Sequence, residues 1–513
     1  MTGEAGRAAR SVRAAERAFD AVFGLRANPL RQLGALAFWM LWIVVASGLW
    51  IYVLYDTSVA GAWRSVNDMT EQQPWAAGLM RSLHRYASDA LIVLTTLHLL
   101  REALLGRFRR FRWFSWVSGV PLLPLAIASG IVGYWMVWDQ RALATGVALF
   151  EWFAQLPGFG LAMVRNFIDP QAVTDRFFSL LAFTHIGLPL LLLLGAWAHL
   201  LRLARPQTQP AAPLAVGSLL ALLALALLWP ARSMALADVL HWPARIDLDW
   251  FTLGVLPLAE AAPIFTWLAL VLGIGALLAM PWVPGAPPAL PVAVVDPAHC
   301  NGCTWCFADC PYGAITMVPH PNARAGARLA QVDADLCAGC GVCVGACPSA
   351  TPFRRGAPLA TGIDLPAPAL ATLRARLDDA LDALDDPEAT KVVVLGCDSA
   401  ARLDDAPPGT VMLTAPCTAQ WPPVFIEYAL RRGVDGVLVT GCPPGDCQWR
   451  LGARWVEQRM AGQRMPQLRS QVPRERVRLH WALTGSKADL LHEVQAFHRA
   501  LAALSRPRVP EDA

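Results

Sequence analysis

Four histidines inside long apolar segments are the residues of this 513-residue chain whose type and spacing most directly suggest chemistry. They form two pairs with the same separation of 14 residues, His84 with His98 and His185 with His199. Fourteen residues of α-helix return to within about 40° of the same face after a rise of ~21 Å. Each helix can therefore present one imidazole near each side of a bilayer, and two such helices can hold two stacked haems.

The alternative is that these are four unrelated polar residues that help helices to pack. Ionisable residues are rare inside membrane helices and usually mark function. The repeated spacing makes a chance arrangement a poor explanation. We therefore interpret the four histidines as haem ligands.

Four glycines repeat the same 14-residue spacing, Gly34 with Gly48 and Gly119 with Gly133. A single glycine in a membrane helix more often marks close packing of two helices. Two pairs that match the histidine spacing favour a different role. We predict that they leave room for a flat macrocycle.

Two arginines flank the first histidine pair, Arg81 three residues before His84 and Arg101 three residues after His98. Arginine is well suited to binding carboxylates. We predict that each arginine neutralises a haem propionate, and anchoring at the membrane interface is the alternative.

Eight cysteines form two copies of the run Cys-x2-Cys-x2-Cys-x3-Cys-Pro, which begin at Cys300 and Cys337. In this pattern the fourth cysteine of each run ligates the other cluster. Zinc is the alternative, but structural zinc sites do not usually show this duplicated run. The sequence predicts two 4Fe-4S clusters, one held by Cys300, Cys303, Cys306 and Cys347, and the other by Cys337, Cys340, Cys343 and Cys310.

Four further cysteines stand in a separate C-terminal region: Cys397, Cys417, Cys442 and Cys447. The first three end or follow predicted strands at residues 391–395, 410–414 and 437–440, so an α/β fold can gather them at one sheet edge. Four thiolates suit either a 2Fe-2S cluster or a zinc ion, and spacing does not separate the two. The redox groups predicted nearby favour 2Fe-2S. Clustered cysteines also indicate metal ligation in a reducing compartment and not a disulfide framework.

Six apolar segments come close to the ~20 residues that a membrane crossing requires. They are residues 34–55, 79–100, 113–138, 178–201, 212–229 and 262–282. Arginines gather before the first segment, between the second and third, and after the fourth. The positive-inside rule therefore places both termini and all the cysteines on the cytoplasmic side of a bacterial inner membrane.

Residues 31–205 resemble the N-terminal half of cytochrome b from quinol-oxidising bc-type complexes. The resemblance rests on the histidine pairs and on Arg81-Ser-Leu-His84, His98-Leu-Leu-Arg101, Trp116-Val-Ser-Gly119, Gly133-Tyr134 and Trp138-Asp139-Gln140. It implies that His84 and His185 share the haem nearer the outer face, and that His98 and His199 share the other.

The Pro-Glu-Trp-Tyr loop that this family uses for quinol oxidation is missing from the sequence. Its nearest chemical analogue is Asp247-Leu-Asp249-Trp250, where an acidic residue beside aromatic residues can accept a quinol proton. Asp247, Asp249 and Trp250 are therefore the candidate quinone contacts. A solvated loop that touches the membrane interface through Trp250 is the alternative.

Two further resemblances lie in the cysteine-rich half. Residues 295–355 resemble bacterial two-cluster ferredoxins. Residues 390–482 resemble the delta subunit of methyl-viologen-reducing hydrogenase, through Gly433-Val-Asp-Gly436 and Gly441-Cys-Pro-Pro-Gly-Asp-Cys447. That family has Cys-x-x-Cys where this chain has Cys397-Asp-Ser-Ala400. The resemblance implies a heterodisulfide-reductase-A-like flavoprotein, or other cytoplasmic dehydrogenase or hydrogenase subunits, as partner.

Together these observations predict a multi-domain protein. It combines an all-α six-helix transmembrane cytochrome b-like bundle, a small α+β ferredoxin-like domain and a small α/β C-terminal domain. The expected boundaries are an amphipathic N-terminal segment (1–30), the dihaem domain (31–285), the ferredoxin-like domain (286–355), a linker with a short helix (356–388), the delta-subunit-like domain (389–483) and a final helix and tail (484–513).

The expected function is a membrane-bound subunit that passes electrons between a cytoplasmic low-potential partner and the quinone pool. The alternative is a membrane anchor and docking module without a quinone site. No dinucleotide fingerprint, Walker loop or nucleophile-base arrangement stands out, and lysine occurs only at 391 and 487, so no lysine-rich nucleic-acid patch is expected. Membrane lipid, a quinone or quinol and a homodimer through the cytochrome b domain complete the expected partners.

Overall fold

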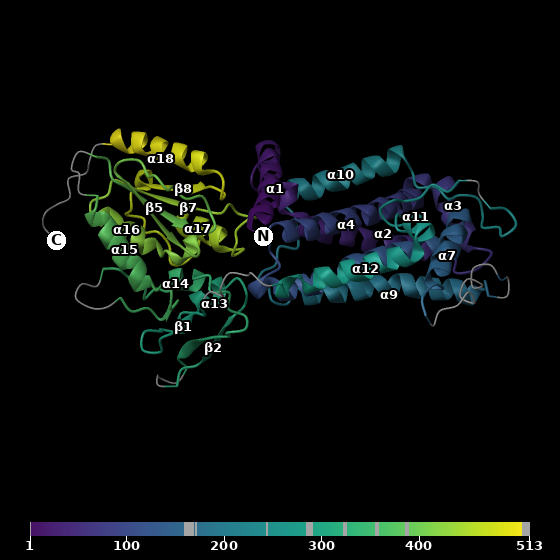
Figure 1. Cartoon of the computed structure of the whole chain (residues 1–513), viewed down its shortest axis with the longest axis horizontal. Coiled ribbons are helices and arrows are strands. Elements are labelled where there is room, and N and C mark those ends of the chain that lie inside the picture. Colours follow the sequence, from purple (N-terminus) through teal and green to yellow (C-terminus); the bar gives the residue numbers. More distant parts are fainter. Residues whose placement is uncertain are drawn as a thin grey trace. The chain divides into compact units, whose positions relative to one another are not determined.

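The computed structural model describes residues 2–157, 169, 172–242, 245–283, 291–321, 326–353, 359–384 and 389–504. The chain divides into two compact units (Figure 1). The first contains Met1–Leu201 and Pro206–Ala286, and the second contains Arg202–Arg205 and Pro287–Ala513. Residues 284–290, at the predicted boundary between the dihaem and ferredoxin-like domains, and the tail beyond residue 504 lie outside the described residues.

Helices occupy all six predicted apolar segments of the first unit, and the third segment is divided into two helices. They are α2 (Leu33–Leu54), α4 (Leu79–Leu104), α5 (Trp113–Gly119) with α6 (Leu122–Met136), α9 (Asp175–Leu200), α10 (Ala212–Leu228) and α12 (Pro263–Ala279). Among the residues that the structure describes, four helical stretches are long and apolar enough to cross a membrane: Leu33–Leu54, Arg110–Met136, Asp175–Leu200 and Pro263–Trp282. Helix α4 carries several charged residues and α10 has only 17 residues, so the count of six crossings stays a prediction.

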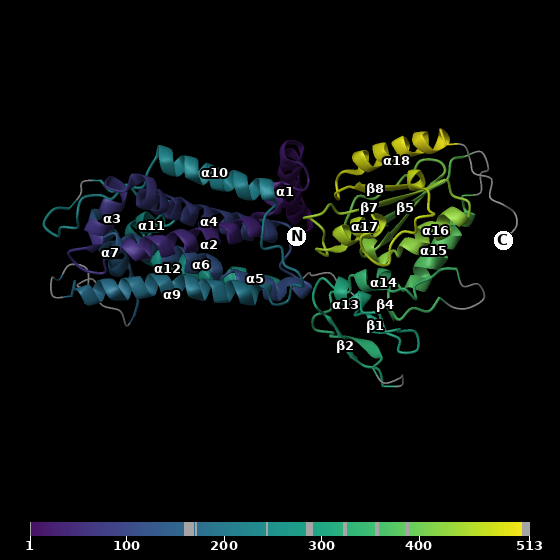
Figure 2. The same ribbon diagram turned by 180° about the vertical axis from the view of Figure 1, so that it is seen from behind.

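The unit is built on two packed helix pairs, α2 with α4 and α6 with α9 (Figure 2). Met40, Leu83 and Leu192 belong to a buried cluster that these helices share. Large apolar side chains also point outward, including Phe183, which is 75 % exposed, and Leu190, which is 61 % exposed. An apolar surface of this extent is expected where helices face lipid.

Shorter elements connect these helices. They are α1 (Thr2–Phe23), η1 (Pro29–Arg31), α3 (Ala62–Glu71), η2 (Pro74–Gly78), η3 (Arg110–Arg112), α7 (Gln140–Phe153), α11 (Leu256–Ala261) and η5 (Met280–Trp282). Helix α1 corresponds to the predicted amphipathic segment, whereas α3 and α7 were not predicted. Helix α7 begins where the Asp139 side chain accepts a hydrogen bond from the Ala142 backbone N–H, a typical N-cap.

The second unit begins with two small antiparallel sheets. Strand β1 (Val294–Val295) pairs with β4 (Ile363–Asp364), and β2 (Ile315–Pro319) pairs with β3 (Arg328–Val332). Short helices α13 (Trp305–Asp309) and α14 (Val342–Gly345) each contain one cysteine of the repeated run. Because β4 completes a sheet with β1, the start of the segment predicted as a linker packs with the ferredoxin-like part.

A four-stranded parallel sheet forms the rest of the unit, in the order β6-β5-β7-β8. Its strands are β5 (Val392–Cys397), β6 (Thr410–Ala415), β7 (Gly436–Gly441) and β8 (Val477–Trp481), and the last of these was not predicted. The helices of this region are α15 (Leu370–Asp382), η6 (Thr418–Gln420), α16 (Pro423–Arg431), α17 (Gly452–Met460), η7 (Arg474–Arg476) and α18 (Lys487–Ala502).

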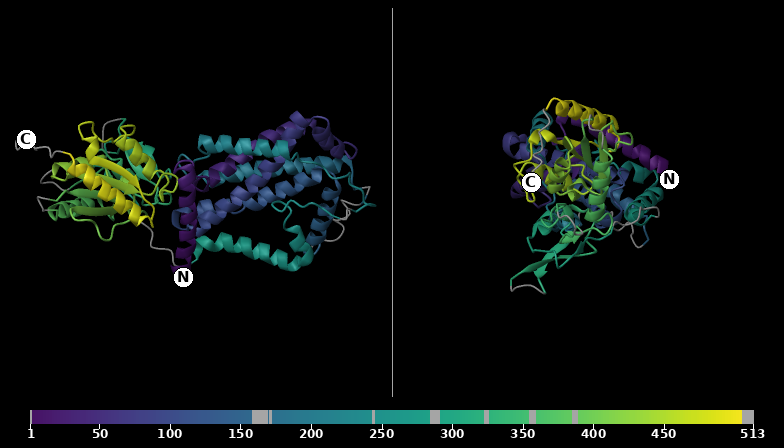
Figure 3. Two further views of the ribbon diagram at one scale, coloured as in Figure 1. Left: turned by 90° about the horizontal axis from the view of Figure 1, so that it is seen from above. Right: turned by 90° about the vertical axis from the view of Figure 1, so that its left-hand side faces the viewer.

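Helix α18 covers one face of this sheet, and α15 and α16 lie on the other side (Figures 1 and 3). Leu490 and Phe497 of α18 pack on Val392 and Val394 of β5, all of them completely buried. The final helix, predicted to lie outside the delta-subunit-like domain, therefore shares its core.

Candidate redox centres

The predicted ligand histidines of the first unit meet in pairs. The imidazoles of His84 on α4 and His185 on α9 have centroids 6.2 Å apart. Two imidazoles that bind one metal at ~2.0–2.1 Å each have centroids roughly 6 Å apart, so this spacing fits a shared metal ion such as a haem iron. His98 and His199 are near enough to interact electrostatically. The structure brings together the same pairs that the sequence resemblance implied.

Each of the four glycines with 14-residue spacing lies against one of these imidazoles. A methyl group at any of these positions would press on the ring, because a built Cβ falls at or inside the shortest ordinary contact distances. The pairs, with the distance from that Cβ to the histidine Cε1, are Gly34 with His98 (3.3 Å), Gly48 with His84 (2.9 Å), Gly119 with His199 (2.8 Å) and Gly133 with His185 (2.8 Å). The glycines thus leave room for the imidazole rings, whereas the sequence analysis predicted room for the macrocycle.

Backbone carbonyls orient the imidazoles. His84 Nδ1 lies 3.0 Å from the carbonyl oxygen of Val44, and His185 Nδ1 lies 3.0 Å from that of Ser129. Since a carbonyl only accepts, each Nδ1 must carry the hydrogen, which leaves Nε2 free to bind a metal. Val44 and Ser129 each precede a facing glycine, Gly48 or Gly133, by four residues. Residue type does not reveal these carbonyls, so the sequence analysis missed them.

The two arginines predicted to bind propionates have protein partners. Arg81 donates to Thr70 Oγ1 at 2.6 Å, and Arg101 forms ion pairs with Glu16 at 2.6 Å and with Glu102 at 2.8 Å. Their role toward a haem stays a prediction.

The three candidate quinone contacts differ sharply in burial. Asp247 is exposed and Trp250 is 70 % exposed, whereas Asp249 is only 6 % exposed. The Asp249 carboxylate accepts a hydrogen bond from the Tyr134 hydroxyl at 3.0 Å and lies 3.2 Å from Arg85, the residue after His84. Asp89 also pairs with Arg85, so two carboxylates share one guanidinium. The sequence analysis did not identify Arg85 and Asp89, whose only signal is a charge inside an apolar helix.

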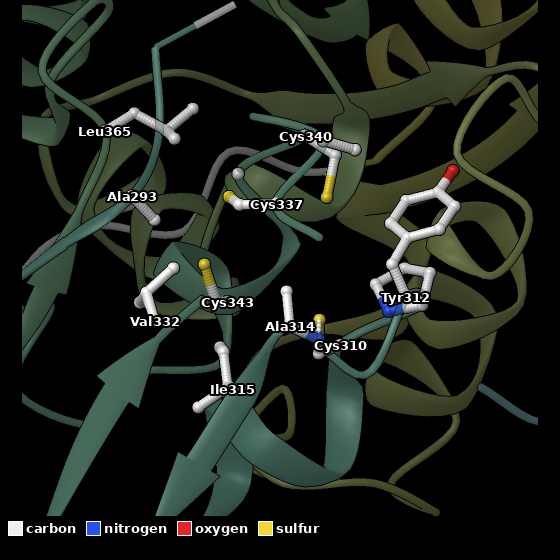
Figure 4. Close-up of a pocket in the computed structure, with 13 residues that line it drawn as sticks. Ala293, Cys310, Tyr312, Ala314, Ile315, Val332, Cys337, Cys340, Cys343 and Leu365 are labelled. Carbon is white, nitrogen blue, oxygen red and sulfur yellow. Dashed lines mark hydrogen bonds between the residues drawn. The ribbon is translucent and has the colours of Figure 1, made fainter. Parts of the chain in front are cut away.

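The eight cysteines of the repeated run line two separate cavities. One cavity has Cys300, Cys303, Cys306 and Cys347 in its wall. The other has Cys310, Cys337, Cys340 and Cys343, and the close-up shows them with apolar neighbours such as Ile315, Val332 and Leu365 (Figure 4). Each cavity therefore collects the four cysteines that were predicted to share one cluster.

The burial of these thiols, which raises their pKa, fits a role as metal ligands. Burial raises the pKa of Cys306 to about 12 and raises that of Cys343 well above its ordinary value. Such thiols ionise only when a cation compensates the charge, and metal binding does this by displacing the protons. Within the described ranges no three metal-binding side chains are drawn together tightly enough to hold a single ion, so the fit to clusters rests on the two cavities.

The four remaining cysteines meet at the carboxyl edge of the parallel sheet. Cys397 ends β5, and Cys417 and Cys442 follow β6 and β7, so the strand ends gather them. Cys397 Sγ lies 3.7 Å from Cys442 Sγ. A hydrogen bond from the Cys417 thiol lowers the pKa of Cys447 to about 7. All four are buried, and they form a second kind of cysteine site, built on strand ends.

Comparison with known proteins identifies the class of each region. The model of the cytochrome b/b6/petB family matches residues 26–207, that of the 4Fe-4S dicluster domain matches 299–351, and that of the methyl-viologen-reducing hydrogenase delta subunit matches 396–505. The third match extends through α18, beyond the predicted boundary at residue 483. The three domains follow one another in the order expected from the sequence.

The chain belongs to the cytochrome b family. It is 31 % identical over 179 residues to cytochrome b6 of Gracilaria tenuistipitata var. liui, covering 34 % of this chain and 80 % of the relative. It is 30 % identical over 178 residues to the menaquinol:cytochrome c reductase cytochrome b subunit of Geobacillus thermodenitrificans, covering 34 % of this chain and 77 % of the relative. A solved structure titled "Hyperthermophilic respiratory Complex III" has 19 % identity and a TM-score of 0.41, and the match covers 50 % of this chain and 75 % of that chain.

These matches define a membrane electron-transfer subunit of an oxidoreductase complex. The cytochrome b domain implies haem b, and the dicluster domain implies iron-sulfur clusters. Four apolar helices of spanning length agree with a membrane protein.

Proposed function

We propose that this chain passes electrons between a cytoplasmic low-potential redox partner and the membrane quinone pool. The observation that carries the quinone part is the buried Asp249, which is hydrogen-bonded by Tyr134 and paired with Arg85 beside His84. When bound, two b haems, two 4Fe-4S clusters and one 2Fe-2S cluster supply one-electron redox chemistry. The chain's own residues hold these groups and manage protons.

The ligand sets follow from the residues that converge. His84 with His185 and His98 with His199 hold the haems, supported by the 6.2 Å centroid spacing of the first pair. The two cysteine-lined cavities hold the 4Fe-4S clusters. Four buried thiols at the strand ends suit 2Fe-2S, which we favour over zinc because the neighbouring sites are redox sites.

Asp249 is our candidate for the group that takes a proton from quinol. Oxidation of a quinol releases two electrons and two protons, so an electron acceptor must have a proton acceptor close by. Arg85 lies 3.2 Å from the Asp249 carboxylate and favours its ionised form, and Tyr134 fixes its orientation. Asp247 and Trp250 are exposed, which suits a rim or a contact with the membrane interface.

We infer the orientation of the chain in the membrane from the distribution of its arginines. We place the Arg-rich segments, both termini and every cysteine on the cytoplasmic side of a bacterial inner membrane. A heterodisulfide-reductase-A-like flavoprotein, or another dehydrogenase or hydrogenase subunit, then meets the delta-subunit-like domain. A homodimer through the cytochrome b domain stays a prediction.

Asp249→Asn tests the quinone site. The variant should slow haem b reduction by added quinol about 100-fold, because a proton acceptor typically contributes 10²–10⁴-fold, while haem content stays at the wild-type level. Glu260→Gln, at an exposed carboxylate on α11 outside the candidate quinone contacts, is the control and should leave the rate unchanged.

Stopped-flow absorbance of purified membranes measures this rate. Full activity of Asp249→Asn would contradict the assignment of Asp249. Wild-type haem that does not respond to any quinol would instead favour the second candidate function, a membrane anchor and docking module for a heterodisulfide-reductase-like or hydrogenase-like complex.

A further inference from the structure

A completely buried arginine connects the ferredoxin-like region to the delta-subunit-like domain. Arg459 on α17 and Asp309 on α13 are each 1 % exposed and form an ion pair of 2.5 Å. Arg464 also pairs with Asp309, and the indole of Trp455 donates to the Asp309 carbonyl at 3.0 Å. Burying a charge is costly unless it is paired and hydrogen-bonded. A pair this deep therefore fixes how the two regions meet.

Arg459 reaches a third segment as well. Its guanidinium donates to the carbonyl oxygen of Ala419 at 3.0 Å, in the turn that follows Cys417. The backbones are in close contact there, since a Cβ on Gly345 would lie 1.9 Å from the same oxygen. The α14 segment and the Cys417 turn have no room for a side chain between them.

This contact places particular cysteine sites next to each other. A Cβ on Gly341, the residue after Cys340, would lie 2.6 Å from the Gln420 side chain in the turn that follows Cys417. Helix α14, which contains Cys343, also packs against α13, which contains Cys306 of the other cavity. The site of Cys310, Cys337, Cys340 and Cys343 therefore lies between the other two.

Arg459 stands where two of these sites adjoin. Asp309, its partner, directly precedes Cys310, and the Ala419 carbonyl that accepts from Arg459 lies two residues after Cys417. We propose that Arg459 is a positioning residue that couples the strand-end site to the site of Cys310, Cys337, Cys340 and Cys343. These two sites are then consecutive in electron transfer, and the site of Cys300, Cys303, Cys306 and Cys347 comes next.

The coupling acts through charge. When one electron leaves one of these two centres and enters the other, no bond forms or breaks and no proton moves. Each centre becomes more negative by one charge when it is reduced, and the adjacent guanidinium stabilises that charge in a water-poor environment. Loss of the cation should lower the reduction potentials of both centres, whereas loss of the Asp309 carboxylate should raise them.

The test is an EPR-monitored redox titration of the full-length chain with all clusters bound, reduced by dithionite through mediators. Arg459→Gln should shift the potentials of the two adjoining centres downward and leave the third nearly unchanged. Asp309→Asn should shift the same two upward, and Arg459→Lys should restore nearly wild-type values. Arg478→Gln, which breaks a partly exposed pair with Glu493 in the same domain, is the control and should shift none.

Opposite shifts distinguish electrostatics from a merely structural contact. Equal shifts at all three centres, no shift, or shifts of one sign in both variants would overturn the proposal. If Arg459→Gln loses iron and labile sulfide, Arg459→Lys and Asp309→Asn still decide the outcome. The proposal rests on the cluster ligands of the proposed function but not on its quinone site, and this titration reads no haem or quinone. Failure of the quinol assay and failure here are therefore distinguishable.

Discussion

The two units prepare their redox sites in different ways. In the membrane unit the imidazoles project from α4 and α9 onto the glycines of neighbouring helices, and carbonyls such as that of Val44 set their tautomer. In the other unit the cysteines stand in loops, short helices and strand ends around small cavities. The rise of a helix fixes how far apart its ligands lie along the helix axis. A loop fixes only that cysteines near one another in sequence lie close together in space.

This difference indicates which contacts each kind of site depends on. The histidine sites depend on the absence of a methyl group at each glycine, because a Cβ there would press on the imidazole ring. The cysteine sites depend on contacts between distant segments, such as the Asp309–Arg459 pair. A substitution should therefore damage a histidine site when its side chain displaces the imidazole. It should damage a cysteine site when it removes a thiolate or one partner of a buried ion pair.

The largest effect is expected from His98→Leu, which removes a proposed haem ligand from α4. The variant should lose one of the two haems and stop electron transfer across the membrane, as measured by haem content and by optical spectra of membranes. His241→Leu replaces an exposed loop histidine and should keep both haems. Unchanged haem content in His98→Leu would reject the ligand assignment.

Cys442→Ser tests the strand-end site in the same way. The variant should lose about two iron atoms per chain and keep both 4Fe-4S clusters, as measured by metal analysis and EPR. Ser399→Ala is a suitable control, because Cys442 contacts only the Ser399 backbone carbonyl. Loss of zinc in place of iron would make this a zinc site.

Gly133→Val tests steric exclusion directly. A Cβ there would lie 2.8 Å from the His185 Cε1, so the ring must move, and overpacking of this kind costs ~1–3 kcal/mol. Haem occupancy should fall partially, with an altered spectrum of one haem. Gly187→Val on α9 has open space around it and should retain both haems. Equal occupancy in the two variants would mean that the glycine contacts are not required.

The smallest effect on haem content is expected from Glu16→Gln, in the buried network that docks α1. Glu16 is 0 % exposed and pairs with Arg31 and Arg101, which keep other acidic partners. Breaking a buried ion pair costs about 3 kcal/mol, so α1 should become accessible to trypsin without loss of haem. Glu151→Gln, at an exposed site, is the control. Haem loss in Glu16→Gln would show instead that this network supports a haem site.

The sequence revealed those parts of the sites that repeat at a fixed interval. The 14-residue spacing predicted the histidines together with their glycines, and the cysteine runs predicted which thiols share a cavity. Val44, Asp309 and Arg459 were not predictable, because a carbonyl has no residue signature and the two charged residues are 150 positions apart. Strand β8 was missed because the strands were predicted from runs of β-branched residues, and Val477–Trp481 contains only one such residue, Val477.

The exchange of Cys310 and Cys347 between the two cavities has a consequence for biogenesis. Each cavity receives three thiols from one run and the fourth from the other run. Neither ligand set is complete until both halves of the segment have folded together. We therefore expect the two clusters to be inserted as a unit, with half-loaded chains rare and readily degraded during maturation.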